Sequence, residues 1–191
     1  MGGEERGQTS LDFAVGMSTL LLVFAFVLTF VPGILGPFTA SGQEGTITAD
    51  RVADHLAEGL LAEPGTPYVL NTTCTVNFLD DTANPDCQYS GDNLSDRVGI
   101  SRYGANKPYR QQINVSIVGN VSGPDGENIL CWDDNSDVVF EHDETDCDES
   151  TGDIILSNGD ANPPTDTGSV VAARRIVSID GQAATLLVRV W

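Results

Sequence analysis

The N-terminal part of the chain is one apolar stretch, and a polar chain follows it. No charged residue occurs between Phe13 and Gln43. As a helix, the most apolar part, Phe13–Val31, would be about 28 Å long, which matches the hydrocarbon thickness of a bilayer. The few small and hydroxyl-bearing residues within it are tolerated in membrane helices. We therefore predict a membrane-spanning helix, which Pro32-Gly33 bends or ends.

A cleaved secretory signal peptide is the alternative interpretation of this stretch. Its apolar part is longer than the core of a typical signal peptide, and Glu4-Glu5-Arg6 is a poor basic region to precede such a core. Small residues around Ala40-Ser41-Gly42 leave this alternative open. We favour a helix that is retained.

A second helix is predicted over Thr48–Leu61. Thr48 is suited to cap its start, and Pro64-Gly65 enforces a stop. Apolar residues recur at helical spacing along it: Ala49, Val52, Ala53, Leu56 and Leu60. The pattern predicts an amphipathic helix that packs on a sheet.

The remaining chain alternates apolar and polar residues, as strands do. Tyr68–Leu79 and Gln111–Val121 are predicted strands whose wet faces carry Asn71, Asn114 and Ser116. Strands Val170–Ile179 and Ala183–Val190 are joined by Asp180-Gly181, a strong hairpin signal, and Arg175 should lie at an edge or be paired. Shorter strands are predicted at Ile129–Trp132, Val138–Glu141 and Ile154–Leu156, and a loop at residues 158–168.

These elements predict an α+β fold. A long N-terminal membrane helix, residues 8–38, is followed by a spacer and the amphipathic helix, residues 39–65. A mainly antiparallel, acidic β domain with disulfides, residues 66–191, completes the chain and is expected outside the cell.

The charge balance excludes one class of partner. Nine basic residues stand against 28 acidic ones, which gives a formal net charge of −19. Phosphate recognition needs a basic surface, so nucleic acid is not an expected partner.

Four cysteines follow the apolar stretch: Cys74, Cys87, Cys131 and Cys147. Their spacing matches no zinc ribbon or redox pair, and an even set outside the cell indicates two disulfides. Of the three possible pairings we favour Cys74–Cys87 and Cys131–Cys147, because short loops close most readily; free buried thiols are the alternative. Arg6 precedes the helix and no basic residue follows until Arg51, which favours a cytoplasmic N-terminus.

The residues just before the apolar stretch, Arg6-Gly7-Gln8-Thr9-Ser10-Leu11-Asp12-Phe13, resemble the class III signal peptide of archaeal type IV pilin-like proteins. The resemblance implies that a prepilin peptidase removes a leader, residues 1–7, by cutting between Gly7 and Gln8. Ser10 and Asp12 then match the serine and the acidic residue of the motif. Asp stands where Glu dominates in that family, and Gly16 where a large aliphatic residue is common.

The physical chemistry of Asp12 agrees with that assignment. A carboxylate at the start of a membrane helix is costly unless it is paired, and the ammonium created at Gln8 is a suitable partner on the same or a neighbouring subunit. A local role is compatible with this one, because Thr9-x-x-Asp12 is also a capping box that can start a helix.

The acidic, lysine-poor composition resembles that of proteins from extremely halophilic archaea. At molar salt the Debye length is about 3 Å, so the negative charge no longer drives the chain apart. The chain also resembles small haloarchaeal, membrane-anchored pilin-like proteins of undefined role, in Arg174-Arg175 and in the tail Val188–Trp191.

Two further patterns concern binding and modification. Oxygen ligands at the 1, 3, 5 and 12 positions of a calcium loop are supplied by Asp133, Asn135, Asp137 and Glu144, although Val138 stands where a glycine is needed. A hydrated acidic surface loop is the interpretation that we favour for this region. Four N-glycosylation sequons begin at Asn71, Asn93, Asn114 and Asn120.

No pattern of catalytic residues is visible in the sequence. The two histidines, His55 and His142, belong to no nucleophile–base motif and are expected at the surface. The sequence therefore predicts a non-enzymatic, membrane-anchored protein, and the resemblance implies a pilin-like cell-surface subunit of a type IV pilus-like filament or secretion pseudopilus. Expected partners are the membrane, a prepilin peptidase and other pilin-like subunits; no cofactor is expected except Ca²⁺ in the acidic loop. The alternative is an unassembled anchored ectodomain that binds a ligand or cation.

Overall fold

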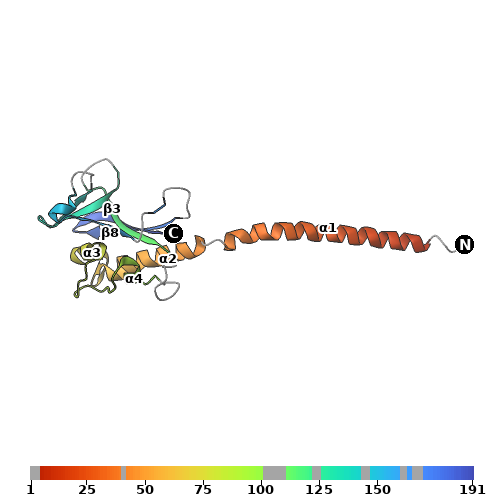
Figure 1. Cartoon of the computed structure of the whole chain (residues 1–191), viewed down its shortest axis with the longest axis horizontal. Coiled ribbons are helices and arrows are strands. Elements are labelled where there is room, and N and C mark those ends of the chain that lie inside the picture. The colour runs from red at the N-terminus through yellow and green to blue at the C-terminus, as the bar shows by residue number, and fades with distance from the viewer. Residues whose placement is uncertain are drawn as a thin grey trace. The chain divides into compact units, whose positions relative to one another are not determined.

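The structure is a computed structural model that describes residues 5–39, 42–100, 111–121, 126–142, 147–159, 163–164 and 170–191. It divides into two units, Met1–Ser41 and Gly42–Trp191. The first is a single helix and the second is a mixed sheet with helices on one side (Figure 1). Each unit is described by itself below.

The first unit consists of helix α1, Glu5–Thr39. The helix runs through Pro32-Gly33 and does not end there, which was one of the two outcomes predicted for this pair. A proline within a helix removes one backbone hydrogen bond, and here the α-helical ladder resumes on the other side and continues for two more turns.

The second unit is built on a sheet in the order β1-β2-β8-β9-β3-β4-β5. Its strands are β1 (Ala62–Glu63), β2 (Thr66–Leu70), β3 (Ile113–Gly119), β4 (Asn128–Asp133), β5 (Val138–Glu141), β6 (Ile154–Ile155), β7 (Ser157–Gly159), β8 (Val171–Ile179) and β9 (Gln182–Val190). Strand β6 pairs with β4, and β7 pairs with β3. The β2–β8 pair is parallel, whereas the neighbouring pairs run antiparallel. The predicted α+β class with a mainly antiparallel sheet is confirmed.

The centre of this sheet is the β8–β9 hairpin, which the Asp180-Gly181 turn closes as predicted. Both turn residues have positive φ, 51° and 72°, as a type I′ turn requires. On the inner face, Val177, Leu186 and Val188 are buried. Cross-strand pairs Ile113↔Val190, Val115↔Val188 and Ile117↔Leu186 extend the apolar layer onto β3.

Helix α2, Gly42–His55, covers this apolar layer together with the π-helical segment η1, Leu56–Leu60. The predicted apolar positions Ala49, Val52, Ala53 and Leu56 are buried. The helix begins six residues before the predicted cap, so Thr48 lies inside it and donates its hydroxyl proton to the carbonyl of Glu44 (2.8 Å). A threonine inside a helix can satisfy its hydroxyl in this way, which removes the need for a cap at that position.

Arg175 is the charged residue on the inner face of β8, and it is paired as predicted. Its Nε donates to Asp54 Oδ1, and its NH2 group lies 3.3 Å from Asp50 Oδ1, so that one guanidinium joins β8 to α2. The bond to Arg175 lowers the pKa of the Asp54 carboxyl.

The predicted strand Tyr68–Leu79 is wrong beyond Leu70. Residues Thr72–Leu79 form helix α3, and Asn71 caps it by accepting a hydrogen bond from the backbone N–H of Cys74 (2.9 Å). The buried residues are two neighbouring pairs, Thr75 with Val76 and Phe78 with Leu79. In a strand, neighbouring side chains point to opposite faces, whereas a helix can place both pairs on one face. The β-branched residues suggested a strand, and the asparagine cap and the packing decided for a helix.

Strand β3 lies where predicted, but its polar face is not wet. Asn114 and Ser116 are buried, because β7 pairs alongside them and the Ser116 hydroxyl lies 3.0 Å from both Asn114 Oδ1 and Ser157 Oγ. The two strands are so close that a Cβ on Gly159 would lie 2.7 Å from the carbonyl oxygen of Ile113. Polar groups on this face are satisfied by each other.

Candidate functional site

Helix α1 has no apolar partner within its own unit. Its segment Leu11–Phe30 has a mean hydropathy of 2.3, and none of it is buried. It is the one helix among the described residues that is long and apolar enough to cross a membrane. A single-pass membrane anchor is compatible with this helix, and a signal sequence would meet the same criteria.

The hydroxyl groups of α1 are satisfied within the helix. Ser18, Thr19 and Thr29 each donate to the carbonyl oxygen four residues earlier, at 2.7, 3.0 and 2.7 Å. In a hydrocarbon medium an unsatisfied hydroxyl would be costly. These bonds leave α1 with an uncharged, hydrogen-bond-satisfied surface between Phe13 and Phe30.

Asp12 lies within α1, next to the first residue of the apolar segment. The helix already begins at Glu5, so the capping box Thr9-x-x-Asp12 does not start it in the full-length chain. The proposed cleavage bond, Gly7–Gln8, falls inside the first turns of this helix. Residues 1–4 of the predicted leader lie outside the described residues.

Both predicted disulfides are present. Cys74–Cys87 and Cys131–Cys147 have Cα–Cα distances of 5.6 and 6.1 Å, within the range for such bonds. The first ties α3 to the segment that leads to the short helix α4, Leu94–Arg97, and the second ties β4 to residues beyond β5.

Arg97 stabilises the region around the first disulfide, a role that the sequence analysis missed. Its side chain is buried and donates to the carbonyl oxygens of Phe78 (2.9 Å) and Gly91 (3.2 Å). Its guanidinium also pairs with Asp81 (3.4 Å) and lies 5.1 Å from the centre of the Tyr89 ring. One arginine thus caps the C-terminal end of α3 and lies over the contacting rings of Phe78 and Tyr89; its sequence surroundings carry no signal of this.

The proposed calcium ligands are arranged as a hairpin turn. The Ser136 hydroxyl donates to Asp133, and so do the backbone N–H groups of Asn135 (2.8 Å) and Ser136 (3.2 Å). The hydroxyl bond first, and then the backbone bonds, lower the pKa of the Asp133 carboxyl. Asp137 has a φ of 55° and completes the turn between β4 and β5. Glu144 lies outside the described residues. Among those that are described, no three His, Cys, Asp or Glu side chains are grouped to hold a metal ion.

The four sequon asparagines have three different environments. Asn71 and Asn93 cap helices α3 and α4 and are half-buried. Asn114 is 8% exposed. Asn120, just after β3, is exposed.

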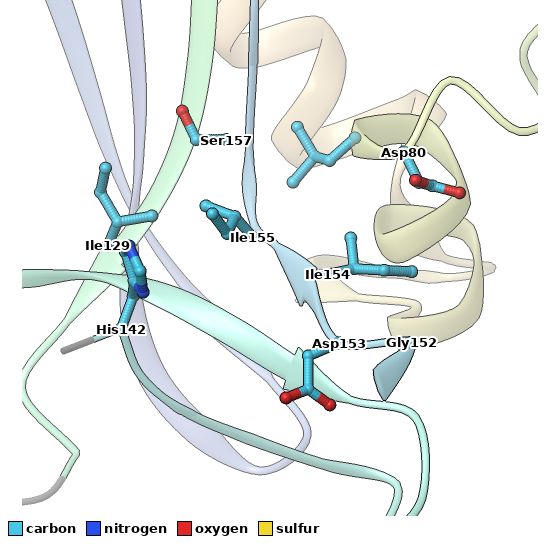
Figure 2. Close-up of a pocket in the computed structure, with 9 residues that line it drawn as sticks. Asp80, Ile129, His142, Gly152, Asp153, Ile154, Ile155 and Ser157 are labelled. Carbon is cyan, nitrogen blue, oxygen red and sulfur yellow. The ribbon is translucent and has the colours of Figure 1, made fainter. Parts of the chain in front are cut away.

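A cavity with a volume of about 690 Å³ opens on the described surface. It lies between the C-terminal end of α3 and the strands β4, β6 and β7 (Figure 2). His142 lines it and is half-buried, not at the surface as expected, and its Nδ1 is buried with no hydrogen-bond partner among the described residues. His55 is exposed. The cavity residues are Leu79, Asp80, Ile129, His142, Gly152, Asp153, Ile154, Ile155 and Ser157.

Comparison with known families gives one match, which covers residues 4–191 and is described as a family of unknown function, DUF7287. The chain belongs to the DUF7287 family. No curated protein and no solved structure matches it.

The region matched by the DUF7287 family includes both units of the chain. It extends over all of α1 as well as the disulfide domain, so the apolar helix is part of the family pattern together with the sheet. The features to be explained are therefore an uncharged helix with an acid at its start, and a disulfide domain with an acidic cavity.

Proposed function

We propose that the chain is a pilin-like, membrane-anchored subunit of the cell surface with no catalytic role. Helix α1 carries the proposal: it is apolar on every side and has one carboxylate, Asp12, at the beginning of its apolar segment. A helix that is exposed to water on one side has a polar face, and Leu11–Phe30 has none.

Cleavage between Gly7 and Gln8 would give Asp12 a charged partner. The new ammonium at Gln8 would lie about one helical turn before the Asp12 carboxylate, or close to that of a neighbouring subunit. Cleavage also removes Glu4, Glu5 and Arg6, so the Gln8 ammonium and the Asp12 carboxylate are the charges that remain near the start of the apolar segment. An ion pair then replaces an isolated carboxylate at the membrane, which lowers the cost of burial.

The experiment that tests this proposal is an intact-mass measurement of the protein from its native membrane. A chain that begins at Gln8 is the expected result, and Gly7→Phe should block the cut. Gly16→Ala is the matched control, because a Cβ at Gly16 meets nothing within 4 Å, and this variant should be processed normally. A chain that begins at Met1, or cleavage of the Gly7→Phe variant, would contradict the proposal, and so would a secreted product that begins near Ser41.

The domain is proposed to lie outside the cell, with the original N-terminus in the cytoplasm. Two disulfides support this orientation, since such bonds persist in oxidising compartments, and Arg6 supports it through the positive-inside rule. Protease added to intact cells should degrade the domain. Protection of the domain until the cells are lysed would reverse the assignment.

Assembly into a filament or pseudopilus is the further step of this proposal. Asp12→Ala should leave cleavage intact but prevent recovery of large assemblies by sedimentation, because the neighbour's ammonium loses its partner. Asp180→Asn, in the β8–β9 turn, removes one negative charge elsewhere and should assemble normally. If the wild-type chain stays monomeric in its membrane, the alternative of an unassembled anchored ectodomain is correct.

Growth at high salt and glycosylation complete the proposal. With a net charge of −19, the domain should lose stability as ionic strength falls from molar to about 0.01 M, where the Debye length reaches about 30 Å.

Carbohydrate is expected at the exposed Asn120 before the other sequons, and glycopeptide mapping of the native protein would locate it. Occupancy of the buried Asn114 in the folded protein would contradict this order.

The second candidate function is a binding module on an unassembled anchor. The cavity beside α3 favours it, because its volume falls in the range of small-molecule sites. Its chemistry is considered next.

A further inference from the structure

The cavity between α3 and the β4–β6–β7 edge combines an apolar wall with carboxylates. Leu79 at the end of α3 and Ile154 and Ile155 of β6 provide apolar surface, with Ile129 of β4 on another side. Figure 2 shows the three isoleucines around a common space, with Asp80 and Asp153 at different sides of it. A ligand here would place an apolar body against isoleucines and a polar group near an acid.

The polar side of the cavity is negative. Asp80 accepts the Thr82 hydroxyl at Oδ2 (2.7 Å), and Asp153 accepts the Asp148 N–H at Oδ2 (3.1 Å). The Oδ1 atom of each has no partner among the described residues. Among the described residues that line the space there is no arginine or lysine.

His142 supplies an unused hydrogen-bonding atom. Its backbone N–H donates to the carbonyl of Ile129 (2.7 Å), which fixes the residue at the cavity, while its Nδ1 is buried and unpartnered among the described residues. A buried acceptor without a partner is unfavourable. In the tautomer that leaves Nδ1 unprotonated, this atom accepts a hydrogen bond, and a rotation of the ring toward the cavity would let a ligand N–H supply the donor.

We propose that this cavity binds a small organic cation: an ammonium or guanidinium group on a short, branched apolar body. The cation would lie between Asp80, Asp153 and His142, and the apolar body against the isoleucines. An anion would be repelled by the two carboxylates. A bare divalent cation fits poorly because apolar side chains form so much of the wall, and it would leave the isoleucines without a contact. The inference gives a ligand class to the second candidate function and does not depend on the processing of the N-terminus.

The test uses the full chain in lipid nanodiscs with labelled isoleucine δ-methyl groups. The probe is 3-methylbutylammonium, and 3-methylbutan-1-ol is the neutral isostere that controls for partition into lipid. We expect saturable shifts of the Ile129, Ile154 and Ile155 methyls, with the methyl of Ile176 on β8 unchanged. The alcohol should bind at least about tenfold more weakly, since it lacks the charge-assisted bonds.

Matched variants assign the charge effect to this site. Asp153→Asn and Asp80→Asn should each weaken the binding of the ammonium probe about three- to tenfold and leave the binding of the alcohol unchanged. Asp180→Asn removes the same charge from the β8–β9 turn, which is remote in sequence from every lining residue, and should change nothing. Far-ultraviolet circular dichroism of each variant shows that it is folded.

Three results would overturn the proposal. They are equal shifts with the alcohol, linear shifts that never saturate, and unchanged ammonium affinity in both aspartate variants. Cavity methyls that shift with protein concentration in the absence of the amine would identify a second copy of the chain as the occupant, which also contradicts it. None of these results bears on the mass of the mature chain, so failure here and failure of the pilin-like proposal are separable.

Discussion

Helices α1 and α2 follow one another in the chain but need different surroundings. Helix α2 has one apolar face, which is buried on the β8–β9 hairpin, and a wet face that carries Asp50 and Asp54. Helix α1 is apolar on all sides and buries none of Leu11–Phe30 within its unit. The hydrophobic effect acts on both helices, but the apolar partner of α2 is the domain's own sheet, whereas α1 has no such partner within its own unit. In the function that we propose, a lipid or a neighbouring subunit takes that role.

The largest expected effect separates the two helices by the same substitution. Leu56→Ala, in the segment that continues α2, removes a fully buried side chain and should lower the free energy of unfolding by about 2–5 kcal/mol. Leu28→Ala in α1 is the matched control and should leave domain unfolding unchanged. Trp132 and Trp191 both lie in the domain, so tryptophan fluorescence in denaturant measures this difference. Equal losses for both variants would mean that the helices share one folding unit.

The features that were predicted correctly from the sequence are those that a local pattern determines. Regions where one face is apolar at a regular period were predicted well: the α2 core positions, β3, and the β8–β9 hairpin with its Asp-Gly turn. The disulfide pairing also followed from sequence, because both loops are short. These features depend on local pattern and chain entropy, which a single sequence contains.

The remaining features depend on contacts between distant segments. Helix α3 was predicted as a strand, because its apolar and polar residues alternate. The Asn71 cap and the packing of Phe78 favour a helix instead, and the packing depends on the rest of the fold. Burial of Asn114 and Ser116 requires β7, which comes about 40 residues later in the chain. The position of Arg97 and the cavity at His142 are likewise set by segments that no local pattern connects.

A charge in the middle of α1 is the second prediction, and it tests the external partner directly. Leu21→Arg should reduce membrane insertion, because an arginine at the centre of a spanning helix costs about 2.5–3.5 kcal/mol. Ile47→Arg in α2 is the control: Ile47 is 58% exposed, and the variant should fold and insert normally. The fraction that resists alkaline extraction from membranes measures the effect. If Leu21→Arg inserts like the wild type, α1 is not a membrane span.

The third prediction concerns a buried charge within the domain. Arg97→Met removes the donor to the Phe78 and Gly91 carbonyls and leaves Asp81 without its partner. The loss should be about 1–3 kcal/mol, the usual cost of unsatisfied buried groups. Arg174→Met is the matched control, since Arg174 is exposed and pairs with Glu127 at the surface (2.9 Å); its effect should stay below about 0.5 kcal/mol. Denaturant midpoints compare the two, and similar losses would show that the burial of Arg97 contributes nothing.

The smallest expected effect is that of the ion pair joining α2 to the sheet. Arg175 holds the pKa of Asp54 below its ordinary value of 3.8, so the pair stabilises the fold above that pH, and this contribution is lost as the pH falls through the lowered pKa. Because the pair is only partly buried and solvent screens it, its coupling energy at pH 7 should be about 0.2–1 kcal/mol. A double-mutant cycle with Asp54→Asn and Arg175→Gln, unfolded in denaturant at pH 7 and again well below 3.8, measures it. The coupling should disappear at the lower pH, where both states of the chain carry a protonated Asp54. A coupling that persists there would mean that a neutral hydrogen bond between Arg175 and Asp54, and not an ion pair, joins α2 to the sheet.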